Sequence, residues 1–231
     1  MGTTVLLLHA FPVGAEMWQP QLEALAGYEV RAPSLVGRGD SIDGWAEQLL
    51  AETADDLVVI GASMGGYCAL AIAKRAPERV RGVVLSGSRA SADPPGGRAW
   101  RDQSIALVRE KGALALWQTM RDYAIGPGTD PVAAKRLDDY IAGHDPEGVV
   151  QELVAMIGRE DTTDVVRTLA CPFLAIAGEL DQGVIAESKQ LAELASDGEL
   201  VIVPWANHLV SFQRPDLVNP ILLRFLERCI G

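Results

Sequence analysis

The alternation of short apolar runs with longer helix-like segments is the feature that most restricts the fold of this 231-residue sequence. Runs rich in leucine, isoleucine and valine predict strands at residues 4–8, 28–32, 57–60, 80–86, 173–177 and 200–203. Helix-like patterns lie between them, at residues 18–26, 42–52, 64–75, 184–195 and 215–229. Strands that alternate with helices form βαβ units, whose strands are parallel. The sequence therefore predicts an α/β fold with a mostly parallel sheet and flanking helices.

The segment between residues 88 and 168 interrupts this alternation. It contains no convincing strand, and its helix-like stretches lie at residues 98–111, 113–124, 131–142 and 146–158. An all-helical insertion in a strand–helix series is expected to lie over the carboxyl edge of the sheet, where open α/β sheets bind ligands. We therefore expect an α/β core formed by residues 1–88 and 166–231, and a helical cap formed by residues 89–165.

The acidic composition restricts the partners of the chain. Asp and Glu number 31 against 20 Lys and Arg, which gives a net charge of −11. We do not expect nucleic acid as a partner, because the sequence has no basic run that could neutralise phosphates. No apolar stretch approaches the roughly 18 residues of a membrane span, and the first residues lack the positive charge of a signal peptide. We expect no membrane partner and a cytoplasmic location.

Cysteine usage agrees with a reducing compartment. The three cysteines are widely spaced and odd in number, at Cys68, Cys171 and Cys229. This spacing is typical of neither a disulfide framework nor a metal cluster. We interpret all three as small hydrophobic residues and predict no metal site.

The segment Gly61-Ala62-Ser63-Met64-Gly65 matches the pattern G-x-S-x-G. An expected strand ends directly before it and an alanine-rich helix begins directly after it. A strand that turns at once into a helix holds the serine in a strained conformation, with its hydroxyl exposed at the tip. Glycines suit this turn because a Cβ at 61 or 65 would crowd its neighbours. Ser63 is the candidate nucleophile; the alternative is a simple helix N-cap.

A serine needs a base to remove its proton, and histidine is the usual one. Of the three histidines, His9 ends the first strand, where a hydrogen-bonding role is expected, and His144 lies at a proline-bounded break in the insertion. His208 follows the last expected strand, in a loop at its carboxyl end. Because Ser63 is expected at the same edge of the sheet, His208 is the candidate base.

The third residue must be a carboxylate that orients the imidazole. Gly178-Glu179-Leu180-Asp181 follows the strand expected at residues 173–177. Asp181 is the better candidate and Glu179 the second choice. The chain order of serine, aspartate and histidine is the order of α/β-hydrolases, and differs from that of the chymotrypsin and subtilisin types.

Two backbone N–H groups are expected to stabilise the oxyanion of such a site. The first is that of Met64, directly after the nucleophile, and the second comes from the loop after the first strand. In that loop, at residues 9–12, we choose the Phe11 N–H; Pro12 has no N–H, but its fixed φ stiffens the loop.

These motifs together resemble the α/β-hydrolase superfamily over nearly the full chain, and more narrowly its small capped esterases and enol-lactonases. Further features that carry the resemblance are Gly37-x-Gly39-x-Ser41 and Asn207-His208. The resemblance implies an α/β-hydrolase fold that lacks the first two strands, the triad Ser63, Asp181 and His208, the oxyanion donors Phe11 and Met64, and no metal or organic cofactor. Departures are Ala10, where a glycine is common, and Ser34, where many members have an aspartate.

The predicted function is that of a serine hydrolase that cleaves carboxylic esters of short to medium acyl chain through an acyl-enzyme. Apolar residues of the insertion at roughly helical spacing favour an apolar group of a small-molecule ester. Those we expect to bind the substrate are Trp100, Trp117, Met120 and Tyr123.

Two alternatives remain open at the level of sequence. An inward-facing arginine of the insertion would bind a substrate carboxylate and favour an enol-lactonase or a C–C bond hydrolase. The candidates are Arg89, Arg98, Arg101 and Arg121. A protein of another class, a slow-turnover ligand receptor on the same fold, is compatible with the same motifs. We expect a monomer or a homodimer, the latter because an exposed sheet edge could pair.

Overall fold

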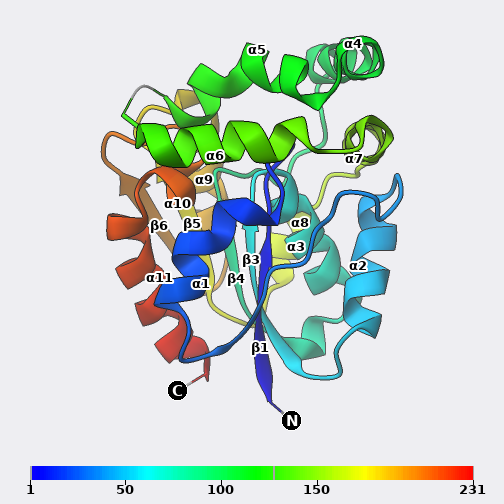
Figure 1. Ribbon diagram of the computed structural model, residues 1–231. Coiled ribbons are helices and arrows are strands. Elements are labelled where there is room, and N and C mark those ends of the chain that lie inside the picture. Colours follow the sequence, from blue (N-terminus) through cyan, green and yellow to red (C-terminus); the bar gives the residue numbers. More distant parts are fainter. Residues whose placement is uncertain (1, 127, 231) are drawn as a thin grey trace.

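A six-stranded parallel sheet forms the centre of the computed structural model, which describes residues 2–126 and 128–230 (Figure 1). The strands are β1 (Thr3–Leu8), β2 (Glu29–Arg31), β3 (Asp56–Ala62), β4 (Val80–Ser86), β5 (Phe173–Gly178) and β6 (Gly198–Val203). Their order is β2-β1-β3-β4-β5-β6, and every neighbouring pair is parallel. The predicted parallel α/β sheet is confirmed.

The burial of the strands follows from their composition. β3 and β5 are almost entirely apolar, and nearly all of their residues are buried, because helices cover both faces of the sheet. The edge strands differ: β2 has three residues and β6 is partly exposed over most of its length.

Helices cover the two faces of the sheet. On one face α3 (Met64–Arg75) contacts β1, β3 and β4, and α2 (Ile42–Ala51) and α8 (Thr163–Thr168) pack against α3. Beyond α8, α9 (Gln182–Leu194) packs on β5 and β6. On the other face, α1 (Gln19–Ala24) packs against α11 (Pro215–Ile230) (Figure 1). The remaining short helices of the core are η1 (Ala15–Trp18), η2 (Pro77–Arg79) and α10 (Val210–Gln213).

Four helices inserted between β4 and α8 lie across the carboxyl end of the sheet, opposite both termini (Figure 1). They are α4 (Pro95–Lys111), α5 (Ala113–Ile125), α6 (Pro131–Ala142) and α7 (Pro146–Ile157). Asp130 caps α6 and Asp145 caps α7, each by accepting a backbone N–H of the first turn, and each precedes a proline at N1. The four helices thus lie at the edge over which the sequence places a cap; the division into a core of residues 1–88 and 166–231 and a cap of residues 89–165 stays a prediction.

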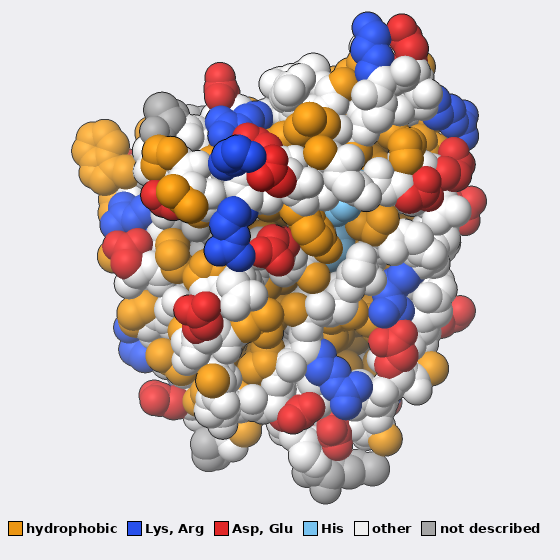
Figure 2. Space-filling view, viewed as in Figure 1, with side chains coloured by type: hydrophobic (Ala, Val, Ile, Leu, Met, Phe, Trp, Pro, Cys, Tyr) orange, Lys and Arg blue, Asp and Glu red, His pale blue; other side chains and the backbone are white. Residues whose placement is uncertain are grey.

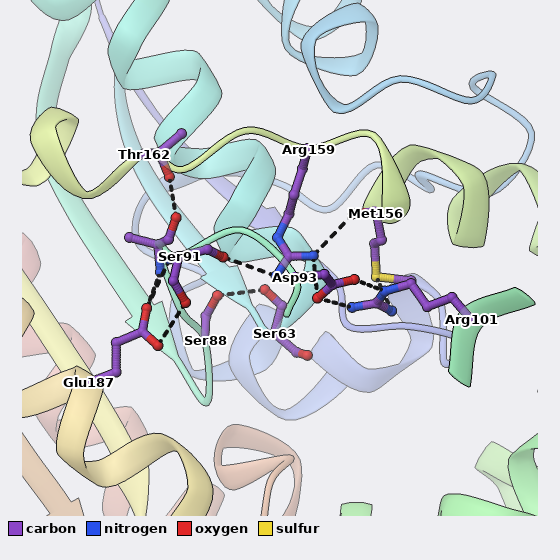
Figure 3. Close-up of polar contacts among 10 residues, drawn as sticks. Ser63, Ser88, Ser91, Asp93, Arg101, Met156, Arg159, Thr162 and Glu187 are labelled. Carbon is purple, nitrogen blue, oxygen red and sulfur yellow. Dashed lines mark hydrogen bonds and ion pairs between the residues drawn. The ribbon is translucent and has the colours of Figure 1, made fainter. Parts of the chain in front are cut away.

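Hydrogen bonds join the two ends of the insertion. The Thr162 N–H and hydroxyl donate to the Ala90 carbonyl at 2.9 and 3.2 Å. The Glu187 carboxylate, on α9, accepts the N–H groups of Ala90 and Ser91 at 2.9 Å and the Ser91 hydroxyl at 3.0 Å (Figure 3). We call Ala90, Ser91, Thr162 and Glu187 the stem of the insertion.

The shortest elements differ from the sequence prediction. The helix expected at residues 18–26 is divided into η1 and α1, and α1 has Pro20 in its first turn, where its missing N–H costs no hydrogen bond. Neither α8, of six residues, nor α10, of four, was predicted, since segments this short carry no clear apolar periodicity.

Acidic and basic side chains are interspersed over the face shown in Figure 2, with apolar side chains between them.

Within residues 2–126 and 128–230, no helix combines the length and the apolar character that a bilayer crossing requires.

One acidic side chain lies inside the insertion, surrounded by packed residues. Glu152 of α7 is fully buried, and neither of its carboxyl oxygens has a hydrogen-bond partner among the described residues. Burial raises the pKa of Glu152 well above its ordinary value, because an ionised carboxylate is far more costly to desolvate than a neutral acid. The folded protein therefore holds Glu152 in its neutral form over a wider pH range than the unfolded chain does.

Replacement of Glu152 by methionine is expected to raise the free energy of unfolding by about 1–3 kcal/mol near neutral pH, because an unpaired buried polar group is removed. The unfolded chain ionises above its pKa of about 4.5, so the gain should be small below that pH and grow as the pH rises. Urea unfolding between about pH 4 and pH 8 measures it. The exposed Glu147→Met variant on the same helix is the control. A Glu152→Met protein less stable than the wild type at every pH would contradict the prediction.

Candidate active site

The turn between β3 and α3 holds Ser63 in an unusual backbone conformation. Its φ angle is 46°, in the left-handed region that residues other than glycine rarely adopt. The glycines around it permit close contacts: a Cβ at Gly61 would overlap the Gly65 carbonyl, and one at Gly65 would overlap the Leu8 carbonyl of β1. The turn therefore lies directly against the end of β1.

Hydrogen bonds fix the backbone of Ser63 on both sides. Its N–H donates to the Ser86 carbonyl at the end of β4, at 2.9 Å. Its carbonyl accepts the Ser88 hydroxyl at 2.6 Å (Figure 3) and the Gly66 N–H at 2.9 Å. These bonds compensate for the strain, which costs of order 1–3 kcal/mol at such a residue.

The structure brings Ser63, His208 and Asp181 together in one hydrogen-bonded series. His208 Nε2 lies 2.8 Å from Ser63 Oγ, and His208 Nδ1 lies 2.6 Å from Asp181 Oδ2. The Asp181 side chain is fully buried. Three strands supply the three loops, β3, β5 and β6, whose carboxyl ends meet at one edge of the parallel sheet. The second choice for the carboxylate, Glu179, instead accepts the Trp205 N–H at 3.0 Å.

Tyr123, on α5 of the insertion, also reaches this series. Its hydroxyl donates to Asp181 Oδ1 at 2.9 Å and lies 3.2 Å from His208 Nδ1. Its ring stacks on the imidazole, with centroids 5.1 Å apart and planes inclined by 29°. Burial and the negative charge of Asp181 raise the pKa of Tyr123, so it remains a hydrogen-bond donor.

The loop after β1 is organised by a buried histidine. His9 Nε2 accepts the Leu35 N–H at 2.7 Å, which places the ring proton on Nδ1, from which it is donated to the Ala10 carbonyl at 3.0 Å. Burial lowers the pKa of His9 to about 4, so the ring is neutral near pH 7. The loop lies against the Ser63 turn, because a Cβ at Gly65 would overlap the His9 carbonyl, and Phe11 follows in the same loop.

The two N–H groups predicted as oxyanion donors belong to these neighbouring segments. Met64 is the first residue of α3, where the backbone N–H has no partner within the helix. The Gly65 contacts with the Leu8 and His9 carbonyls bring this helix end against the loop that carries Phe11.

A cavity of about 350 Å³ opens at Ser63 and His208. Its other lining residues are Phe11, Tyr67, Trp100, Arg101, Thr119, Met120, Tyr123 and Met156. The walls are mainly apolar and aromatic, as in most small-molecule sites. Most of them come from the inserted helices α4, α5 and α7.

Three of the four residues predicted to bind the substrate line this cavity: Trp100, Met120 and Tyr123. Trp117 does not. It is fully buried, and its indole N–H donates to Asp138 of α6 at 2.6 Å. Apolar residues occur on both sides of α5, so periodicity alone does not distinguish the side that packs on α6 from the side that faces the cavity.

The sequence reasoning missed Tyr67, Thr119 and Met156 as lining residues. A signal existed for Tyr67, because it lies four residues after Ser63 and therefore on the same face of α3. No such spacing connects Thr119 or Met156 with the motifs, since their helices are placed by tertiary packing.

Two arginines share one carboxylate at the cavity, and one of them, Arg101, belongs to the cavity lining. Arg101 donates to both oxygens of Asp93, and Arg159 Nη1 lies 2.7 Å from Asp93 Oδ1 (Figure 3). All three side chains are nearly buried, and the arginines hold the pKa of Asp93 below its usual value even though burial alone would raise it. Two positive charges against one negative charge leave the cluster with one positive charge.

The other arginines considered as carboxylate ligands are engaged elsewhere. Arg89 donates to the Gly183 carbonyl, and Arg121 pairs with Asp138; Arg98 is absent from the cavity lining. In the part of the chain that the structure describes, no group of three or more His, Cys, Asp or Glu side chains is placed to hold a metal ion.

Comparison with known proteins places the chain in a family. Residues 5–221 match the sequence pattern of the alpha/beta hydrolase family. The chain therefore belongs to the α/β-hydrolase family, and it is a hydrolase by class.

Individual relatives agree with this assignment. A pimeloyl-(acyl-carrier protein) methyl ester esterase from Aromatoleum aromaticum is 30% identical over 77% of this chain, which spans 64% of that relative's length. A putative carbamate hydrolase RutD from Caulobacter sp. is 25% identical over 97% of this chain and 90% of its own. A thermophilic esterase from Thermogutta terrifontis, solved with malate bound, has a TM-score of 0.93 and 28% identity, over all of this chain and 92% of its own.

The buried neutral His9 is expected to make the protein sensitive to mild acid. The unfolded chain takes up a proton near pH 6.5, whereas folded His9 does so only near pH 4. Between these two pH values only the unfolded chain is protonated at this residue, which stabilises the unfolded state. The free energy of unfolding therefore falls by about 3 kcal/mol as the pH decreases from 6.5 to 4.

Denaturant unfolding across this pH range tests the expectation. The His9→Asn variant should show a flatter dependence of stability on pH than the wild type. His144, half-buried and with a pKa that burial also lowers, should change the slope less when replaced by asparagine. Equal slopes for the wild type and His9→Asn would show that His9 does not titrate in this way.

Proposed function

We propose that the protein is a serine hydrolase that cleaves small carboxylic esters of short to medium acyl chain through an acyl-enzyme intermediate. One observation carries the proposal: the series Ser63–His208–Asp181, with distances of 2.8 and 2.6 Å, ends in a mainly apolar cavity. Relatives named as esterases support the substrate class.

The geometry gives each residue a step. His208 takes the proton of Ser63 Oγ as this oxygen attacks the ester carbonyl, and Asp181 stabilises the imidazolium that forms. The N–H groups of Met64 and Phe11 would donate to the oxyanion, each contributing about 3 kcal/mol to transition-state stabilisation. His208 then protonates the leaving alcohol. Water, activated by the same imidazole, releases the acid from Ser63.

The cavity supports the proposed size and polarity of the substrate. Its volume of about 350 Å³ lies at the lower end of the range of roughly 300–1,000 Å³ for small-molecule sites. The side chains of Phe11, Trp100, Met120 and Met156 would exclude water from an apolar group. A long acyl chain would exceed this space.

Steady-state hydrolysis of p-nitrophenyl esters from acetyl to dodecanoyl tests the proposal. We expect multiple turnovers, with kcat/KM greatest for short or medium chains. Ser63→Ala should lower kcat by about 10⁴-fold or more, since removal of a serine nucleophile removes the whole concerted unit.

The outcomes separate the alternatives. Activity that survives in Ser63→Ala would refute the serine mechanism. A single slow event per molecule for every ester would favour a ligand receptor over an enzyme.

The positive charge at the cavity lining favours a second candidate, an enol-lactonase or C–C bond hydrolase whose substrate bears a carboxylate. Arg101 is the lining residue with a permanent charge, and the cluster of Arg101, Asp93 and Arg159 keeps one positive charge in excess. A substrate carboxylate near Arg101 would complete the neutralisation.

A matched pair of substrates measures this contribution. We expect Arg101→Gln to reduce kcat/KM for the p-nitrophenyl monoester of glutaric acid by about tenfold or more, as loss of a charged hydrogen bond predicts, and to affect the uncharged pentanoate ester little. The control is Arg109→Gln, an exposed arginine of the same helix that pairs with Glu147. Equal losses for both substrates would argue against a carboxylate site.

A further inference from the structure

Tyr123 makes contacts that a residue serving only as cavity wall does not need. Its hydroxyl is 2.9 Å from Asp181 Oδ1, while His208 occupies the other oxygen, Oδ2, at 2.6 Å. Among the described residues, Tyr123 is the one that donates a hydrogen bond to Oδ1. Since the Asp181 side chain is fully buried, this bond supplies solvation that water would otherwise provide.

The segment that carries Tyr123 is fastened to the segment that carries His208. The Leu209 N–H, directly after His208, donates to the carbonyl of Ala124, directly after Tyr123, at 2.8 Å. The Gln213 side chain donates to the Ile125 carbonyl and accepts the Asn207 N–H at 2.6 Å.

Close packing adds to these hydrogen bonds. Gly126, which ends α5 with a φ of 57°, lies so close to the Asn207 side chain that a Cβ at 126 would overlap it. The end of α5 and the loop of His208 therefore form one connected unit.

From these contacts we infer that Tyr123 is a positioning residue: its hydroxyl fixes the Asp181 carboxylate and its ring fixes the His208 imidazole, so that an inserted helix sets the geometry of the base. This inference rests on the proposed function in that Ser63, His208 and Asp181 are taken as the reacting series. It differs from the expectation that Tyr123 contacts the substrate.

The hydroxyl of Tyr123 also weakens the attraction of the Asp181 carboxylate for the imidazole proton. A carboxylate that accepts two hydrogen bonds attracts the imidazole proton less strongly than one that accepts a single bond. The other charged or titratable groups that act on Tyr123 are Arg89, which opposes the rise of its pKa, and Tyr67, which adds to it. Removal of the Tyr123 hydroxyl should therefore raise the pKa of His208.

The test is Tyr123→Phe, which keeps the ring and the shape of the cavity. We expect kcat for the best p-nitrophenyl ester to fall about tenfold with KM nearly unchanged, and the acid limb of the kcat/KM profile to move upward by about half a unit to one unit. The control is Tyr140→Phe on α6, where the ring packs edge-on against His144 at 4.9 Å outside the cavity. It should leave kcat and the pH profile unchanged.

A double-mutant cycle shows whether Tyr123 acts through the carboxylate. In an Asp181→Ala background the Tyr123→Phe change should have almost no further effect on kcat, because its partner is absent. Independent, additive losses would overturn the inference, as would a rise in KM with an unchanged pH profile, which marks a substrate contact.

Histidine titration by NMR gives a readout that needs no substrate. Three histidines are present, and the His9→Asn and His144→Asn variants assign the signal of His208. An upward shift of the His208 pKa in Tyr123→Phe supports the inference even if no ester is hydrolysed, in which case the proposed function alone fails. An unchanged His208 titration overturns the inference even in an active esterase. If Tyr123→Phe does not fold, Gln213→Leu loosens the same connection and should shift the titration in the same direction.

Discussion

The left-handed backbone of Ser63 is the constraint on which the rest of the site depends. It is tolerated because glycines at 61 and 65 let the turn touch the end of β1, and because the Ser86 carbonyl and the Ser88 hydroxyl bind its peptide groups. The same contacts place the first turn of α3 beside the loop that holds Phe11. The turn after β3 is thus held by the ends of the neighbouring strands β1 and β4, because the parallel direction of the three strands brings their carboxyl ends to one place.

Core and insertion divide the work of the site. The loops of the sheet supply Ser63, Asp181 and His208, which require fixed distances, whereas the inserted helices supply most of the cavity wall. Tyr123 belongs to both groups, because it lines the cavity and contacts two of the three polar side chains. Tyr123 therefore links the inserted helix α5 directly to the polar side chains that the core loops supply.

The amino-acid sequence carries enough information for the sheet and for the residues at its edge. Buried parallel strands are apolar throughout, so their runs are visible, and Ser63, Asp181 and His208 each follow such a run. The parallel sheet and the family are confirmed; the catalytic roles of these residues stay predictions.

Within the insertion the same reasoning reaches less far. The apolar residues of α5 lie on two faces, and only packing decides that Trp117 points to α6 while Met120 points to the cavity. The hydrogen bond of Tyr123 to Asp181 joins residues 58 positions apart. Glu152 is fully buried, although a glutamate is expected at the surface. Neither follows from a local pattern, since both depend on how the helices are placed over the sheet.

The stem has a consequence for how such a protein can diversify. Thr162 donates hydrogen bonds to the Ala90 carbonyl, and the Glu187 carboxylate accepts the N–H groups of Ala90 and Ser91. The chain therefore leaves the core and returns to it at almost one point. Helices between those residues can lengthen, shorten or be exchanged during evolution without disturbing the sheet. A new substrate range is thus accessible through exchange of one chain segment, provided that the replacement again presents a hydrogen-bond donor to Asp181.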